Sequence, residues 1–159
     1  MLVKMVLTVT FLAALGAGLM AGLYFAFSNS VMGALGRLPA AQGIAAMTSI
    51  DVVIMNPLFL GVFMGTAALA VFLAIAALLG WGVPRPSFVL AGAALYIIGN
   101  IVVTSAINVP MNNALAAVAP DSAAGAQLWS VYLDRWVFWN HVRTVSCLAA
   151  LAAFIAALM

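Results

Sequence analysis

The residues best suited to chemistry in this chain lie together, in a stretch that reads WSVYLDRWVFWNHVR. This stretch holds three tryptophans, a tyrosine, an asparagine and the only histidine, and an almost wholly apolar segment follows it. On a helix, at about 100° per residue, aromatic rings share one stripe with an amide and a guanidinium: Trp129, Tyr132, Trp136, Asn140 and Arg143. Rings that can stack and groups that can donate hydrogen bonds, combined at the entry to an apolar segment, indicate the floor of a binding site.

The single histidine, His141, is the side chain best able to exchange a proton near neutral pH. On a helical wheel drawn at the same 100° per residue, His141 lies about 140° from Trp136, away from the stripe of aromatic rings and amide. It is therefore either a general base on a second wall of the site or a spectator at the membrane surface. The only cysteine, Cys147, lies seven residues further on without a CxxC or HExxH pattern. The sequence therefore predicts no metal site within one chain.

Composition places these residues in a membrane protein. Of the 159 residues, 68% are hydrophobic and only 5% are charged, whereas about a quarter of the residues in a soluble domain are charged. The net charge of +2 reflects a scarcity of acids and not a basic cluster, so nucleic-acid binding is not predicted. We expect an integral, multi-pass membrane protein whose first partner is the lipid bilayer.

The apolar segments define the expected fold. Each of four is long enough to cross about 30 Å of hydrocarbon, and they cover residues 5–27, 58–79, 88–107 and 137–158 approximately. Residues 1–159 are therefore expected to form a single all-α domain, a four-transmembrane-helix bundle. GxxxG pairs at Gly18/Gly22 and Gly61/Gly65 predict close helix contacts.

The connections between the segments are unequal in length. Residues 80–87 form a tight turn with two prolines, whereas residues 28–57 and 108–136 form two long connections. With four crossings, both long connections lie on the same membrane face. Each is long enough for a short helix, predicted at about 40–55 and 122–135.

Polar residues that a membrane span would avoid occur at the ends of the segments that meet this face. Tyr24 ends the first span, Asn56 opens the second, and Asn140, His141 and Arg143 open the fourth. On the third, polar residues follow at four-residue intervals: Asn100, Thr104, Asn108 and Asn112. The sequence predicts that these groups converge on one site beneath the long connections.

Simpler roles stay open for several of these residues. Asn56 precedes a proline and suits a helix N-cap, and Asn100 and Thr104 suit hydrogen bonds between helices. Arg143 either snorkels to the interface or faces an internal polar cavity. Asp51, in the first long connection, could reach Arg143 only through the fold.

Three motifs together resemble the anthrone oxygenase-like membrane proteins, a family long catalogued as a domain of unknown function. They are GLYFAFSNSVM at residues 22–32, NVPMNNAL at residues 108–115 and WxxYxxxWxxWNHVRT at residues 129–144. The resemblance covers nearly the whole chain. It implies a small membrane monooxygenase that oxidises an anthrone, or a related lipophilic phenol or quinol, with O₂ as co-substrate and no flavin, haem or metal.

The resemblance also suggests roles for the polar and aromatic residues. His141, Arg143 and Asn140 are the expected catalytic residues, with His141 as the base and the other two as oxyanion donors. The residues expected to bind a lipophilic aromatic substrate are Asn108, Asn112, Trp136, Tyr132, Trp129, Asn56 and Tyr24.

Two other functions compete with this one. The same cleft could serve a non-catalytic membrane module that binds a lipid, a quinone or a partner protein. A haem or copper protein using His141 and Met111 is a third alternative, although one histidine per chain rules out bis-histidine haem within a protomer. The sequence leaves open whether the chain forms a homo-oligomer.

Overall fold

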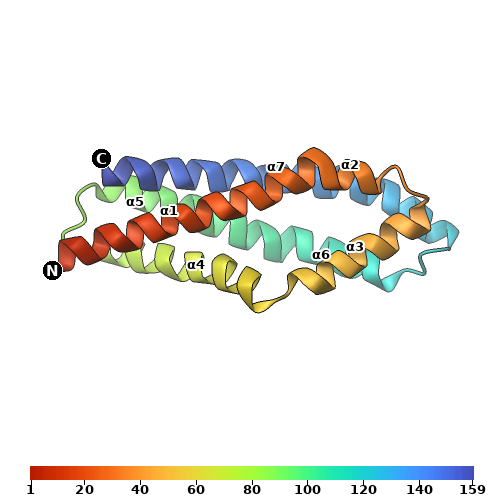
Figure 1. Cartoon of the computed structure of the whole chain (residues 1–159), viewed down its shortest axis with the longest axis horizontal. Coiled ribbons are helices and arrows are strands. Elements are labelled where there is room, and N and C mark those ends of the chain that lie inside the picture. Colours follow the sequence, from red (N-terminus) through yellow and green to blue (C-terminus); the bar gives the residue numbers. More distant parts are fainter.

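The computed structural model describes all 159 residues and consists of helices and short connections (Figure 1). Four continuous helical spans are long and apolar enough to cross a membrane: Leu2–Leu35, Pro57–Leu78, Pro86–Ala117 and Ala123–Leu158. The prediction of an all-α chain with four membrane-spanning helices is thus confirmed.

The spans are built from shorter elements. The first comprises α1 (Leu2–Ala26), the π-helical η1 (Phe27–Val31) and α2 (Met32–Leu35). The second is α4 (Pro57–Leu78), and the shorter helix α3 (Ala40–Ile54) precedes it in the chain. The third comprises α5 (Pro86–Tyr96), the π-helical η2 (Ile97–Val102) and η3 (Thr104–Asn108), and α6 (Val109–Ala117). The fourth is α7 (Ala123–Leu158).

The helices extend further than the sequence predicted. The expected pair at 122–135 and 137–158 is one helix, α7, because no proline or glycine interrupts the chain after Gly125. The third span continues to Ala117 although Pro110 lies within it. Pro110 is in the first turn of α6, directly after η3, where the wider turns of a π-helix can absorb the missing N–H.

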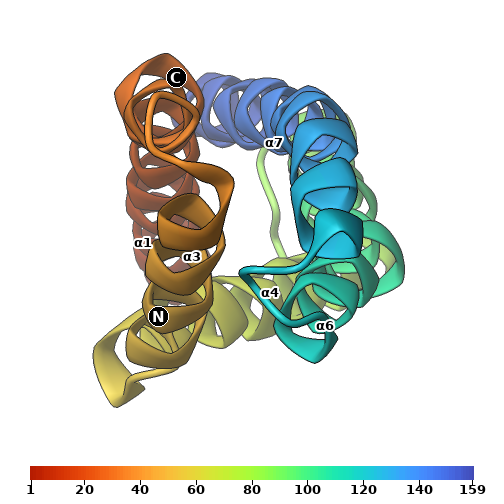
Figure 2. The ribbon, with the colours of Figure 1, turned by 90° about the vertical axis from the view of Figure 1, so that its right-hand side faces the viewer.

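The result is an up-down-up-down bundle longer than the hydrocarbon core. At the end with both termini, α1, α4, α5 and α7 form a ring in which each helix contacts two neighbours (Figures 1 and 2). At the other end α3 and α6 join α7. The helices α3 and α4 follow each other along the bundle and together form its second column. This column is broken between them, where Asn56 caps α4 and Pro57 occupies its first turn. The long connections of the prediction are thus mostly helical continuations of the bundle.

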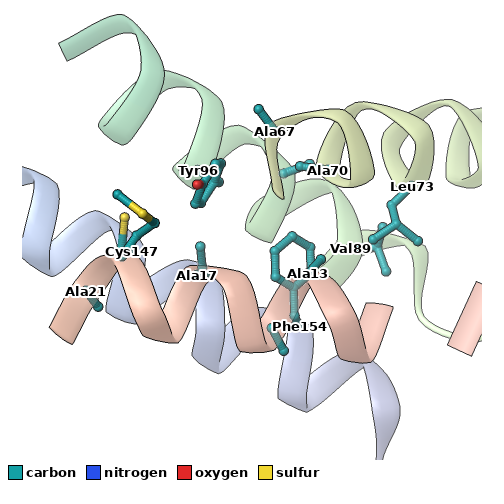
Figure 3. Close-up of a cluster of buried hydrophobic side chains, with 14 of the residues drawn as sticks. Ala13, Ala17, Ala21, Ala67, Ala70, Leu73, Val89, Tyr96, Cys147 and Phe154 are labelled. Carbon is teal, nitrogen blue, oxygen red and sulfur yellow. The ribbon is translucent and has the colours of Figure 1, made fainter. Parts of the chain in front are cut away.

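Two apolar clusters hold the bundle together. The first lies between α1, α4, α5 and α7, where alanines such as Ala17 and Ala70 face the larger Tyr96 and Phe154 (Figure 3). The second lies at the opposite end and is richer in large side chains: Met32, Leu35, Ile44, Met47, Leu115, Trp129, Tyr132 and Trp136. The outer surface of the membrane-spanning part carries many exposed large hydrophobic side chains, as a lipid-facing surface requires.

Close helix contacts occur at glycines other than those predicted. A methyl group added at Gly22, Gly61 or Gly65 would meet nothing within 4 Å, so the GxxxG prediction was wrong at these positions. Gly43 of α3 is different, because a Cβ there would lie 2.7 Å from Cζ2 of Trp129 on α7. Only glycine lets α3 approach α7 this closely.

Replacing this glycine should loosen the end of the bundle that contains α3. We expect Gly43→Ala to lower stability by about 1–3 kcal/mol, the usual cost of overpacking, because the packed Trp129 ring must move. Gly61→Ala is the matched control, and its open surroundings together with the higher helix propensity of alanine should leave stability unchanged or slightly raised. Thermal unfolding in detergent, followed by tryptophan fluorescence, measures both. Equal transition temperatures would show that the contact is not tight.

Candidate functional site

A cavity lies midway along the bundle, where the two apolar clusters meet. Its volume is about 280 Å³, and 10 of its 15 lining residues are hydrophobic. Ile54, Met55 and Phe59, on either side of the break between α3 and α4, form part of the wall. The other five lining residues are polar and come from α3, the third span and α7: Asp51, Thr104, Asn112, Asn113 and Arg143. An apolar pocket with a few convergent polar groups is the usual form of a small-molecule site.

Arg143 supplies a buried positive charge to this cavity. Its guanidinium donates hydrogen bonds to Asn140 Oδ1 at 2.6 Å and to Thr104 Oγ1 at 3.3 Å. It also lies 4.2 Å from the ring centroid of Tyr24 and 5.2 Å from that of Trp136. Both hydrogen-bond partners are neutral, and Nε has no partner. The charge is therefore available to an anion inside the cavity.

Asn140 fixes the position of that guanidinium. Its Nδ2 donates to the Tyr24 carbonyl at 2.7 Å and to Ser28 Oγ at 2.6 Å. With both amide hydrogens directed at the first span, the amide oxygen faces Arg143. Ser28 lies in η1, so the wide turn of the first span and the middle of α7 are joined through this one amide.

Asn112 organises the opposite wall. Its Oδ1 accepts hydrogen bonds from Tyr132 Oη and Trp136 Nε1, both at 2.9 Å. Its Nδ2 donates to Asp51 Oδ1 at 3.0 Å. The aromatic stripe of α7 thus orients an amide of α6, and that amide orients a carboxylate of α3.

The π-helical turns explain how the third span presents its polar residues. In an α-helix, residues four apart drift by about 40° per step, and the wider i→i+5 turns of η2 and η3 oppose this drift. Asn100 and Asn108 are buried, and Thr104 and Asn112 line the cavity. Tyr24 Oη donates to Asn100 Oδ1 at 2.7 Å. The sequence pattern gave no signal for the π-helical winding.

A match to a known protein family covers this region. The family described as anthrone oxygenase matches residues 58–153. The chain belongs to the anthrone oxygenase family. No curated protein and no solved structure matches the chain. The matched range of this anthrone oxygenase family member includes Asn112 and Arg143, whereas Tyr24 and Asp51 lie before it.

The predicted site residues divide into three groups. Tyr24, Asn112, Trp136 and Arg143 line the cavity. Asn140 and Tyr132 lie behind it and hold lining residues through hydrogen bonds. The remaining four do not line the cavity: Asn56, Asn108, Trp129 and His141.

Each residue in the last group has a different setting. His141 lies on the exposed face of α7, as its offset on the helical wheel requires. Asn56 is the N-cap of α4 and accepts a hydrogen bond from the Phe59 N–H. Trp129 is buried against Gly43. Asn108 is buried with neither side-chain polar atom hydrogen-bonded.

Asp51 is a cavity residue that the sequence analysis treated only as a distant ion-pair partner. Burial raises the pKa of its carboxyl to about 6, while the positive charge of Arg143 opposes part of this rise. The signal for it was present, since it is one of only three acidic residues and stands in the apolar run IDVVIM. No three His, Cys, Asp or Glu side chains gather into a metal-binding group.

Asn140 should matter for stability as well as for the site. Asn140→Ala removes the acceptor of a charged donor and two further hydrogen bonds, and a hydrogen bond to a charged group contributes about 1.5–3 kcal/mol. We expect a loss of at least this size in thermal unfolding in detergent. Asn29→Ala, at an exposed position of η1, is the control and should match the wild type.

The raised pKa of Asp51 also makes a prediction about stability and pH. The folded state binds this proton more tightly than the unfolded chain, so the carboxylate lowers stability once it is ionised, fully above about pH 6 and not at all below about pH 4. Asp51→Asn should therefore raise the unfolding temperature at pH 8, with the gain shrinking towards pH 4. The exposed Asn29→Ala, which changes no titratable group, is the control and should show the same difference from the wild type at both pH values. A pH-independent effect of Asp51→Asn would contradict the assignment.

Proposed function

We propose that this protein is a membrane monooxygenase that oxidises an anthrone, or a related lipophilic phenol or quinol, with O₂ and without a cofactor. The observation that carries the proposal is the pairing of an apolar cavity with a guanidinium whose hydrogen-bond partners are neutral. Membership of the anthrone oxygenase family supports the substrate class.

Oxidation of an anthrone by O₂ requires the protein only to bind the substrate, to help remove a proton and to stabilise the resulting anion. The methylene group of an anthrone lies between two aromatic rings, and loss of one of its protons gives an anion whose charge is delocalised onto the carbonyl oxygen. This electron-rich anion reacts with O₂ directly. Overall, anthrone and O₂ give anthraquinone and water, so the substrate supplies both electron pairs that the oxygen needs.

The cavity suits such an anion. Arg143 would hold the oxyanion in a setting with little water, where an electrostatic contact is strong. Tyr24 and Trp136, whose rings lie against the guanidinium, would stack on the flat rings of the substrate. A volume of about 280 Å³ is at the lower end of the range for ligand pockets, which favours a compact rigid molecule over a two-chain lipid.

The position of the cavity favours a substrate that arrives from the bilayer. Met55, at the break between α3 and α4, lines the cavity and is 61% exposed. Val52, Val53 and Leu58 beside it are also exposed. A lipophilic molecule dissolved in the membrane would reach the cavity past an apolar surface.

Oxygen uptake with anthrone tests the proposal. The wild type, purified in detergent, should consume O₂ faster than the spontaneous background. Arg143→Gln should lower kcat/KM by about 10²–10³, the usual effect of removing an oxyanion donor. Asp134→Asn, at an exposed position of the same helix, should retain full activity.

Two results would contradict the proposal. An Arg143→Gln variant that is folded, with a cooperative thermal transition, and retains wild-type activity would remove the proposed role of the guanidinium. A wild type that consumes no oxygen but co-purifies with a lipophilic ligand would instead be a non-catalytic binding module.

A further inference from the structure

The chain has only three acidic residues, and one of them faces the cavity. Asp121 and Asp134 are exposed on the surface of the bundle. Asp51, on the last turns of α3, lines the cavity together with Arg143. The two charged groups are not hydrogen-bonded to each other, because Arg143 donates to Asn140 and Thr104 and Asp51 accepts from Asn112.

The hydrogen bonds around Asn112 fix the carboxylate of Asp51. Tyr132 Oη and Trp136 Nε1 both donate to Asn112 Oδ1, so the amide cannot flip without facing two donors with its own N–H groups. Its Nδ2 must therefore point towards Asp51, where it donates to Oδ1 at 3.0 Å. One carboxylate oxygen is held by this amide, while the other has no hydrogen-bond partner in the protein and is available to a ligand.

We propose that Asp51 is the general base that removes the substrate's methylene proton, with Asn112 as its positioning residue. The inference rests on the proposed function and assigns the proton acceptor of the same site. His141, the base suggested by residue type alone, lies on the exposed face of α7 and does not line the cavity.

The proton and electron balance can be met with this one carboxylate. Asp51 takes a proton from the methylene carbon, and the electron pair of the C–H bond remains on the substrate as the anion held by Arg143. The anion adds to O₂ and recovers the proton from Asp51, giving a hydroperoxide on that carbon. Asp51 then removes the second hydrogen of the same carbon as a proton, the C=O bond forms, the O–O bond breaks and water leaves with that proton.

The surroundings of Asp51 support this role. The titratable or charged groups that face it are Arg143 and Tyr132 on α7 and Tyr24 on α1, whereas α4 and α6 contribute none to the cavity wall. Burial raises its pKa to about 6, so the carboxylate is ionised at neutral pH and more basic than an ordinary aspartate. A general base works best with a pKa close to the operating pH.

Hydrogen–deuterium exchange at the methylene group, without oxygen, tests proton removal by itself. Anthrone is incubated anaerobically in D₂O buffer with the detergent-purified protein, and loss of the methylene proton signal is followed by NMR. The wild type should accelerate exchange above background. Asp51→Asn, which keeps an acceptor for Asn112, should lose about 100-fold, within the usual range for general base catalysis.

Matched variants separate this inference from its alternatives. Asp134→Asn and His141→Ala should both retain wild-type exchange. Asn112→Ala should slow exchange less than Asp51→Asn, and wild-type exchange should fall as the pH decreases through about 6. Full exchange in a folded Asp51→Asn variant, loss of exchange in His141→Ala, or a wild type without accelerated exchange would each overturn the proposal.

The outcome also distinguishes this inference from the proposed function. If Asp51→Asn abolishes exchange but the wild type consumes no O₂, then Asp51 is the base and the oxygenase proposal fails. If the wild type consumes O₂ and Asp51→Asn is as active, then the oxygenase proposal holds and the base lies elsewhere.

Discussion

A single buried cation, the guanidinium of Arg143, constrains much of this structure. Removing a charge from water is costly unless it is paired or fully hydrogen-bonded, and no carboxylate is hydrogen-bonded to this one. The protein surrounds it with neutral acceptors and two aromatic rings. Asn140 can present its oxygen to Arg143 because its nitrogen is committed to Tyr24 and Ser28. The first and fourth spans are therefore fixed relative to each other by one amide.

On the other wall of the cavity an asparagine likewise holds an ionisable group, here an acidic one. The Asp51 carboxylate is held by Asn112, and Asn112 is held by Tyr132 and Trp136. In both walls an asparagine with its hydrogen-bonding capacity committed holds an ionisable group at the edge of an apolar cavity. Holding two opposite charges apart, rather than as an ion pair, costs stability. The two proposed roles, binding an anion at Arg143 and accepting a proton at Asp51, would account for this loss of stability.

The broken second column gives the site its remaining wall. A continuous helix from Ala40 to Leu78 would follow one line, but the cap at Asn56 and the proline after it end α3 and start α4 in a new direction. Ile54, Met55 and Phe59, around this break, line the cavity. The close approach at Gly43 packs α3 against α7, and Asp51 of α3 and Arg143 of α7 both line the cavity. The break and the glycine together decide that α3 belongs to the site and is not a peripheral connection.

The sequence by itself determined the membrane-spanning fold and the buried stripe of the last helix. Hydrophobic length fixes the number of crossings, and helical periodicity puts Trp136, Asn140 and Arg143 on one stripe and His141 off it. These are local properties of the chain. The tertiary structure decided which groups face each other. The place of Asp51 in the cavity and the hydrogen bonds from Asn140 to Tyr24 and Ser28 depend on contacts between residues far apart in sequence. Periodicity within one helix carries no information about the orientation of another, so the partner of Asn112 could be found only when α3, α6 and α7 were assembled.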